Sequence, residues 1–121
     1  MAKQELEFDD IFFETDGDTQ SKDKYSSLPY VIVRTESAGV FAGYLRAKKG
    51  AEVRLLNARR IWYWEGAATL SQLAMGGSTC PDKCKFPPEM GEVVLLGVSE
   101  IIKTTRVAKE KIEATWIWQA E

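Results

Sequence analysis

The chain has 121 residues, of which 45% are hydrophobic and 28% are charged, and its formal net charge is −2. These values are typical of one globular domain and exclude a disordered or fibrous protein. No apolar run approaches the ~20 residues that a membrane-spanning helix needs. The N-terminal sequence MAKQELEFDD is acidic, whereas a signal peptide begins with basic residues and then becomes apolar. We therefore expect an intracellular protein with no membrane partner.

Acidic residues are concentrated at the N-terminus. Residues 1–20 contain seven acidic residues and one basic residue, so the rest of the chain carries a positive excess. This contrast divides the chain into an acidic arm and linker, residues 1–28, and a single domain, residues 29–121. The arm also holds large apolar side chains, among them Phe8 and Phe12. These favour a short helix or strand that covers the core over a free tail.

The domain begins with three segments of strand character. Residues 30–36 and 40–47 are rich in β-branched and aromatic residues and are separated by a glycine turn. Gly43 marks a bulge or a close approach of two backbones within the second strand. Residues 52–64 form a third long run, with a bend expected near Asn57–Ala58.

Helical patterns alternate with strand patterns in the second half of the domain. Alanine and leucine at helical spacing predict two short helices. The chain is therefore predicted to be an α+β protein, with a small bent antiparallel sheet or open β-barrel and two short helices. The predicted elements are a helix (66–75), a loop (78–91), a helix (105–114) and a strand (115–119). Residues 92–103 are predicted to form either a pair of strands or one strand with a bulge at Gly97.

The chain contains no histidine. Ser-His-Asp and Cys-His catalysis and histidine metal sites are therefore excluded. Cys80 and Cys84 supply two thiols, which are too few for structural zinc unless a second copy completes the site. We expect reduced thiols, with a labile disulfide as the alternative. The sequence predicts no enzyme, no metal and no cofactor.

All four tryptophans occur in Trp-x-Trp pairs, Trp62 with Trp64 and Trp116 with Trp118. Residues two apart in a strand share a face, so each pair is expected to form one aromatic wall, with Arg60 in register with the first. An arginine beside such a wall suits a nucleotide, because the ring stacks on the base and the guanidinium binds phosphate. The alternative is that these rings belong to the core or to a subunit interface.

The distribution of arginines favours a compact anion over extended nucleic acid. The sequence has no long basic stripe, whereas two or three arginines suffice for a nucleotide-sized ligand. Phe86, in a proline-bounded loop, is expected either to stand over this ligand or to anchor the loop in the core. The candidate ligand-binding residues are Arg34, Asn57, Arg59, Arg60, Trp62, Trp64, Phe86 and Arg106.

Two stretches of the chain resemble a family of small phage-encoded proteins. They are VIVRTESAGVFAGYL (31–45) and NARRIWYWEGAATLSQLAMGG (57–77). The likeness runs from about Val31 to Trp118 and does not include the acidic arm. The family is similar to the Thoeris anti-defence sponges, which sequester cyclic ADP-ribose isomers made by bacterial TIR-domain immune enzymes without cleaving them. The resemblance implies a homo-oligomer, a dimer or larger, in the host bacterial cytoplasm, with cyclic oligonucleotides as further ligands.

We therefore expect a phage counter-defence protein that binds and sequesters a cyclic nucleotide immune signal. The resemblance implies this type of site but assigns no individual residue to it. The alternative function is inhibition of a host factor through the acidic N-terminal arm. A nucleotide-processing enzyme is the least expected class, because the chain lacks histidine.

Overall fold

The computed structural model describes residue 25 and residues 27–120. Most of the predicted acidic arm, residues 1–24 and 26, lies outside this part. Five strands form one antiparallel sheet in the order β4-β3-β2-β1-β5. The elements in chain order are β1 (Tyr30–Thr35), β2 (Val40–Lys49), β3 (Glu52–Arg60), α2 (Leu70–Gly76), a 3-10 helix (Pro81–Lys83), β4 (Met90–Leu95), β5 (Val98–Lys103) and α3 (Arg106–Ala114).

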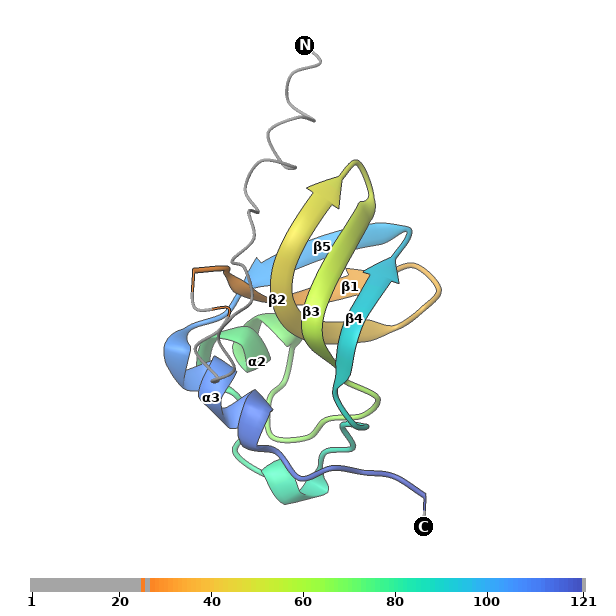
Figure 1. Ribbon diagram of the computed structural model, residues 1–121. Coiled ribbons are helices and arrows are strands. Elements are labelled where there is room, and N and C mark those ends of the chain that lie inside the picture. The colour runs from red at the N-terminus through yellow and green to blue at the C-terminus, as the bar shows by residue number, and fades with distance from the viewer. Residues whose placement is uncertain (1–24, 26, 121) are drawn as a thin grey trace.

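The sheet is strongly curved. In Figure 1, β2, β3 and β4 stand side by side while β1 and β5 cross behind them, and α2 and α3 lie together at one end of the sheet. A short link through Gly97 joins β4 to β5, and the amide of Val98 donates to the carbonyl of Ala51 at 2.9 Å. The sheet is thus an open, unclosed barrel with two helices, which confirms the predicted α+β architecture.

A β-bulge in β3 produces the predicted bend. Ala42 pairs with Arg59 and Tyr44 with Leu56, so Gly43 alone faces two residues of β3. One of them, Asn57, has a φ of 48°, a left-handed conformation that asparagine tolerates better than most residues. A Cβ atom on Gly43 would stand 3.0 Å from the Cα of Ala58. Glycine is therefore required for the close approach of these two strands.

The bulge assigns the side chains of β3 to two different cores. Val53, Leu55 and Ala58 belong to one core, inside the curve of the sheet. The extra residue shifts the alternation by one position, so Arg59 faces the other core, on the side of the helices. The core inside the curve comprises Val31, Val33, Phe41, Val53, Leu55, Ala58 and Leu95. The helix-side core includes Tyr30, Ile32, Tyr44, Leu70, Leu73, Phe86 and Ile112.

Both predicted helices are present and capped by threonine. The hydroxyl of Thr69 accepts a hydrogen bond from the amide of Gln72 at the start of α2, and Thr105 accepts one from Ala108 at the start of α3. The hydroxyl of Thr105 also donates to the carbonyl of Met75 at 2.8 Å. This contact joins the end of the first helix to the start of the second and fixes the direction of α3.

The structure differs from the predicted elements at two places. The third strand ends at Arg60 instead of residue 64, and residues 115–119 do not form a strand. Only isolated bridges remain there, between Tyr63 and Lys85 and between Phe86 and Ile117. In the part of the chain that the structure describes, no helix combines the length and apolar character needed to cross a membrane.

Candidate functional site

Arg59 connects three separate segments of the chain. Its side chain is only 3% exposed. Its three nitrogens donate to carbonyl oxygens of the loop before β4, of the last turn of α3 and of the segment that follows it. The five acceptors are the carbonyls of Phe86, Pro87, Ile112, Thr115 and Trp116, at 2.6–3.2 Å.

These contacts account for Arg59 without a ligand. Burial lowers the pKa of its guanidinium, although the nearby Tyr30 and Glu89 oppose this effect. The group donates to the carbonyls of Ile112 and Thr115 at the C-terminal end of α3, and the carbonyl of Ile112 also accepts from the amide of Thr115. The prediction that Arg59 binds a phosphate is therefore corrected, because every nitrogen of the group is already engaged by protein oxygen atoms.

Two predicted aromatic residues pack against the protein itself. Phe86 is 1% exposed and belongs to the helix-side core, so it has the alternative role, that of a loop anchor. Trp64 is half-buried against the same core, and its indole Nε1 donates to the carbonyl of Ala67 at 3.1 Å. The expectation that Phe86 stands over a ligand is corrected by its burial.

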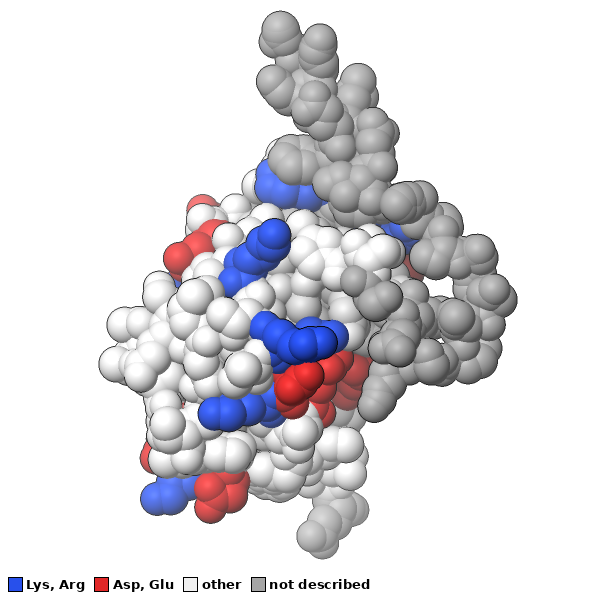
Figure 2. Space-filling model, turned by 90° about the vertical axis from the view of Figure 1, so that its left-hand side faces the viewer, with Lys and Arg blue, Asp and Glu red and all other residues white. Residues whose placement is uncertain are grey.

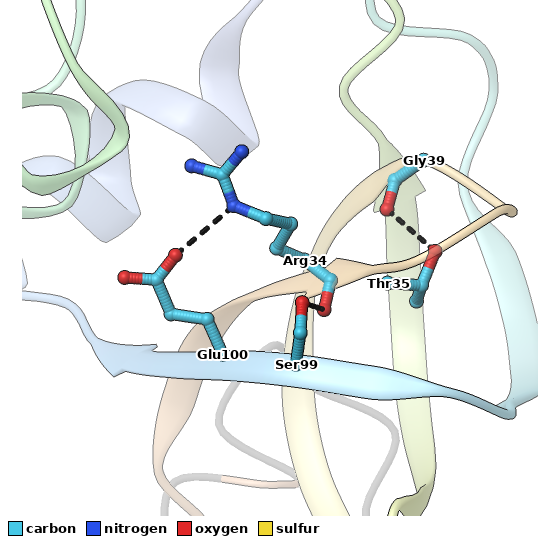
Figure 3. A network of polar contacts seen from close by, with 5 residues as sticks. All are labelled: Arg34, Thr35, Gly39, Ser99 and Glu100. Carbon is cyan, nitrogen blue, oxygen red and sulfur yellow. Dashed lines mark hydrogen bonds and ion pairs between the residues drawn. The ribbon is translucent and has the colours of Figure 1, made fainter.

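The remaining polar candidates lie apart from one another on the surface. Arg34 donates through Nε to Glu100 at 3.0 Å, and its carbonyl accepts from Ser99, as Figure 3 shows. Arg106 lies 3.7 Å from Glu110, one turn along α3. Asn57 adopts the left-handed conformation of the bulge. Arg60 donates to the carbonyl of Ala38, and its guanidinium carbon lies 4.5 Å from the centroid of the Phe41 ring. The structure does not bring the eight predicted residues into one pocket.

Trp62 and Trp118 form a stacked pair at the surface, in which Trp62 is exposed and Trp118 is half-buried. Their ring centroids are 6.2 Å apart and their planes are inclined by 12°. Trp62 is 62% exposed, which is unusual for so large an apolar side chain. The ammonium of Lys85 lies 5.5 Å from the ring of Trp118 and 5.7 Å from the ring of Tyr63. We call Trp62, Tyr63, Lys85 and Trp118 the aromatic patch.

Backbone hydrogen bonds hold the aromatic patch in place. The amide of Lys85 donates to the carbonyl of Tyr63 at 2.8 Å, and the amide of Trp118 donates to the carbonyl of Phe86 at 3.0 Å. At the rim, the hydroxyl of Tyr63 donates to the carboxylate of Glu65, which raises the pKa of Tyr63. The patch is therefore a preformed surface with flat aromatic faces and one cationic group.

Of the aromatic patch, only Trp62 was among the predicted ligand-binding residues. Each Trp-x-Trp pair was expected to form one wall, but neither pair lies in a regular strand, so Trp62 and Trp64 point to different environments. The stacked pair instead takes Trp62 from one motif and Trp118 from the other. No pattern in the sequence indicated Lys85, because its position depends on how the loop before β4 packs.

A cleft of about 460 Å³ lies between the end of α3 and the loop before β4. Glu89 and Glu113 line it, and burial of Glu89, together with repulsion by Glu113, raises the pKa of Glu89. The hydroxyl of Tyr44 donates to Glu113 at 3.0 Å. The complete lining is Arg59, Glu89, Glu113, Ala114, Thr115, Trp116 and Ile117, which we call the acidic cleft.

Tyr30 has a buried hydroxyl that interacts electrostatically with Glu113, Arg59 and Glu89, three residues that line this cleft. The side chain is 5% exposed, and its hydroxyl oxygen has no hydrogen-bond partner among the described residues. Burial raises the pKa of this hydroxyl, and Glu113 and Tyr44 raise it further. The group is thus polar, neutral and without compensation for its lost hydration.

Replacing Tyr30 with phenylalanine is expected to raise the free energy of unfolding by about 1 kcal/mol, because a buried group without a hydrogen bond is removed and the ring is kept. Urea unfolding followed by tryptophan fluorescence measures the change. Tyr44→Phe is the matched control. It removes a hydroxyl that does donate, to Glu113, and is expected to lower the stability. A loss of stability in Tyr30→Phe would contradict the interpretation.

Lysine, arginine and acidic side chains are mixed on the surface. The face shown in Figure 2, which is turned toward the left-hand side of Figure 1, has basic groups interspersed with acidic ones and no continuous basic stripe. Among the described residues no group of three or more cysteine or acidic side chains is placed to hold a metal ion. Cys80 and Cys84 are both free thiols, and Cys84 is buried.

Comparison with known proteins places the chain in a family. No curated protein and no solved structure matches the chain. The chain matches a family model described as a domain of unknown function, DUF6948, over residues 28–112. This range contains the whole sheet, α2 and nearly all of α3. Since it covers well over half of the sequence, the chain belongs to the DUF6948 family.

Proposed function

We propose that the protein binds and sequesters a cyclic nucleotide signal on the aromatic patch without cleaving it. The observation that carries this proposal is the stack of the exposed Trp62 on the half-buried Trp118, beside the ammonium of Lys85. Base–aromatic stacking contributes about 1–3 kcal/mol per base. A lysine ammonium adds a point charge that attracts phosphate.

The chemistry of the patch suits binding rather than turnover. Its polar groups are the Lys85 ammonium, two indole N–H groups and the Tyr63 hydroxyl, which is already bonded to Glu65. A ligand held by stacking and charge leaves unaltered unless a nucleophile or a proton donor attacks it. The patch needs no movement to form, so little free energy is lost in ordering it when a ligand arrives.

The proposal extends to the ligand class, the assembly and the biological setting. The resemblance of residues 31–45 and 57–77 to phage-encoded sponge proteins favours cyclic ADP-ribose isomers or cyclic oligonucleotides made in a bacterial host cytoplasm. A patch on an open surface covers only one side of such a ligand. A homo-oligomer in which two patches face each other would enclose it, and this is the assembly that we propose.

Replacing Trp62 with alanine is expected to weaken ligand binding by about 10- to 100-fold, the factor that corresponds to the loss of one stacking face. Calorimetric titration with cyclic ADP-ribose isomers and cyclic di- and trinucleotides measures the affinity. Lys85→Met is expected to weaken it as well, and more so at low salt.

Leu96→Ala provides the matched control, since Leu96 is 65% exposed and lies between β4 and β5, away from the patch. Mass spectrometry of the ligand released by heating is expected to show it intact. If none of the nucleotides binds the unaltered protein, or if Trp62→Ala binds as tightly as the unaltered protein, the proposal is wrong.

The competing expectation, inhibition of a host factor through the acidic arm, has a separate test. Removing residues 1–24 keeps Tyr25, whose ring packs 5.4 Å from that of Tyr44, and the buried Leu28. Nucleotide binding on the aromatic patch is expected to survive this deletion. Loss of counter-defence activity with nucleotide binding intact would favour the inhibitor.

A further inference from the structure

We infer that the acidic cleft binds a guanidinium group, supplied either by a small molecule or by an arginine side chain of a partner protein. This site is separate from the aromatic patch in its charge and in its ligand. Four features carry the inference: the carboxylates of the cleft, a buried hydroxyl behind its lining, an aromatic wall and the net charge of the lining residues.

Two carboxylates approach the cleft from different elements. Glu113 lies in the last turn of α3, and Glu89 lies in the loop that precedes β4. Burial of Glu89 and its repulsion by Glu113 raise the pKa of Glu89. The C-terminal end of a helix also carries a partial negative charge. A cation placed between the two carboxylates would relieve this repulsion.

The one cation that lines the cleft is Arg59, and its hydrogen-bonding capacity is used. All of its nitrogens donate to backbone carbonyls, so it offers the two carboxylates only its charge. Lys109 lies one turn before Glu113, but its ammonium is over the ring of Tyr44 at 5.4 Å, and no ion pair joins it to Glu113 among the described residues. The lining therefore has a net charge of about −1, which a monovalent cation would neutralise.

The hydroxyl of Tyr30 adds an acceptor in the same region. The residues whose charges act on its pKa include Glu113, Arg59 and Glu89, all of which line the cleft. Its side chain is almost completely buried, and its hydroxyl has no partner among the described residues. A buried hydroxyl without a partner is rare and calls for an explanation, such as a group missing from the site. Tyr30 itself does not line the cleft, so the inferred guanidinium would reach this hydroxyl by entering behind the lining carboxylates.

The wall of the cleft distinguishes a guanidinium from other cations. Trp116 and Ile117 line one side and are 46% and 50% exposed. A planar guanidinium stacks on an indole face while its five N–H donors reach oxygen atoms in its own plane. A metal ion gains nothing from an indole wall and prefers a shell of six or more oxygen ligands. An ammonium lacks the plane that stacking requires.

Titration of the full-length, ¹⁵N-labelled protein with agmatine and with the peptide Gly-Gly-Arg-Gly-Gly tests the inference by NMR. We expect shifts of the Trp116 indole N–H and of the amides of residues 113–117. The peptide with citrulline in place of arginine has the same shape without the charge, and it is expected to produce no shifts. Binding of agmatine alone would identify a small molecule as the source of the guanidinium. Binding of the peptide alone would identify a protein side chain.

Variants of the carboxylates locate the site. Glu89→Gln and Glu113→Gln are each expected to raise the Kd by about tenfold, the cost of losing one charge-assisted hydrogen bond. Glu110→Gln is the matched control, because Glu110 lies on the same helix and does not line the cleft. Tyr30→Phe is expected to raise the Kd while its Tm stays the same or rises, a combination that damage to the fold does not produce.

Three results would overturn the inference. The first is the absence of shifts with both agmatine and the arginine peptide. The second is equal binding of the citrulline peptide. The third is an equal effect of Glu110→Gln and Glu113→Gln, which would show that only the overall charge of α3 matters.

Discussion

Replacing Arg59 with methionine is expected to lower the free energy of unfolding by about 4 kcal/mol, the largest effect of any single substitution considered, because the carbonyls of Pro87, Thr115 and Trp116 lose this donor. The carbonyls of Phe86 and Ile112 keep backbone donors, the amides of Trp118 and Thr115. Methionine keeps the length and apolar character of the side chain but donates no hydrogen bond. The loop before β4 and the segment after α3 then lose the group that joins them to β3. Since that segment carries Trp118, the stack with Trp62 is expected to separate as well.

Guanidinium chloride unfolding, followed by circular dichroism and by tryptophan fluorescence, measures both effects. Arg59→Lys is expected to restore little stability, because one ammonium does not reach five carbonyls spread over three segments. Arg34→Met is the control, since Arg34 forms an exposed ion pair with Glu100, and it is expected to cost less than about 1 kcal/mol. Equal effects of Arg59→Met and Arg34→Met would refute the structural role of Arg59.

Replacing Gly66 with alanine is expected to lower the free energy of unfolding by about 3 kcal/mol, from a steric clash combined with an unfavourable backbone conformation. Gly66 has a φ of 88°. A Cβ atom there would stand 2.6 Å from the amide nitrogen of Thr79 and 2.7 Å from that of Cys80. Both are backbone atoms, so the clash is relieved only if the turn between Trp64 and α2 moves.

Gly50→Ala separates the two contributions to this effect. Gly50 also has a positive φ, 61°, but no atom lies within 4 Å of the Cβ that alanine would add. Its substitution therefore reports the backbone cost alone, about 1 kcal/mol. Thermal unfolding of the two variants side by side measures the difference. If Gly66→Ala is no less stable than Gly50→Ala, the close contact with residues 78–80 does not matter.

The sequence predicted the fold well because its signals are local. β-branched residues indicate the strands, glycine indicates the turns, and threonine at residue 105, a good N-cap residue, caps α3. The bend at Asn57–Ala58 and the close approach at Gly43 are both confirmed as one bulge. The predicted strand at 115–119 was wrong, because its two tryptophans and Ile117 have high strand propensity but pack as an irregular segment.

The sequence predicted the candidate site less well, because the site depends on long-range packing. The identity of Arg59 suggested a phosphate ligand, but the one-residue shift of the bulge turns it toward the helix-side core. Lys85 and Trp118 are 33 residues apart in the sequence and meet only because the loop and the C-terminal segment both pack beside Trp62. Glu89 and Glu113 likewise come together only in the folded chain. That the protein sequesters a cyclic nucleotide signal, and that it uses no cofactor, remain predictions.

The pairing of β1 with β5 has a consequence for synthesis of the protein. Val31 pairs with Lys103. One edge of β1 is therefore unpaired until β5 has been synthesised, when most of the domain has already left the ribosome. During that interval the apolar residues of β1 lie on a strand edge that is open to pairing with other nascent chains. We expect the last folding event to be the joining of these two strands, and chaperones that cover apolar strands to be needed most between the emergence of β1 and that of β5.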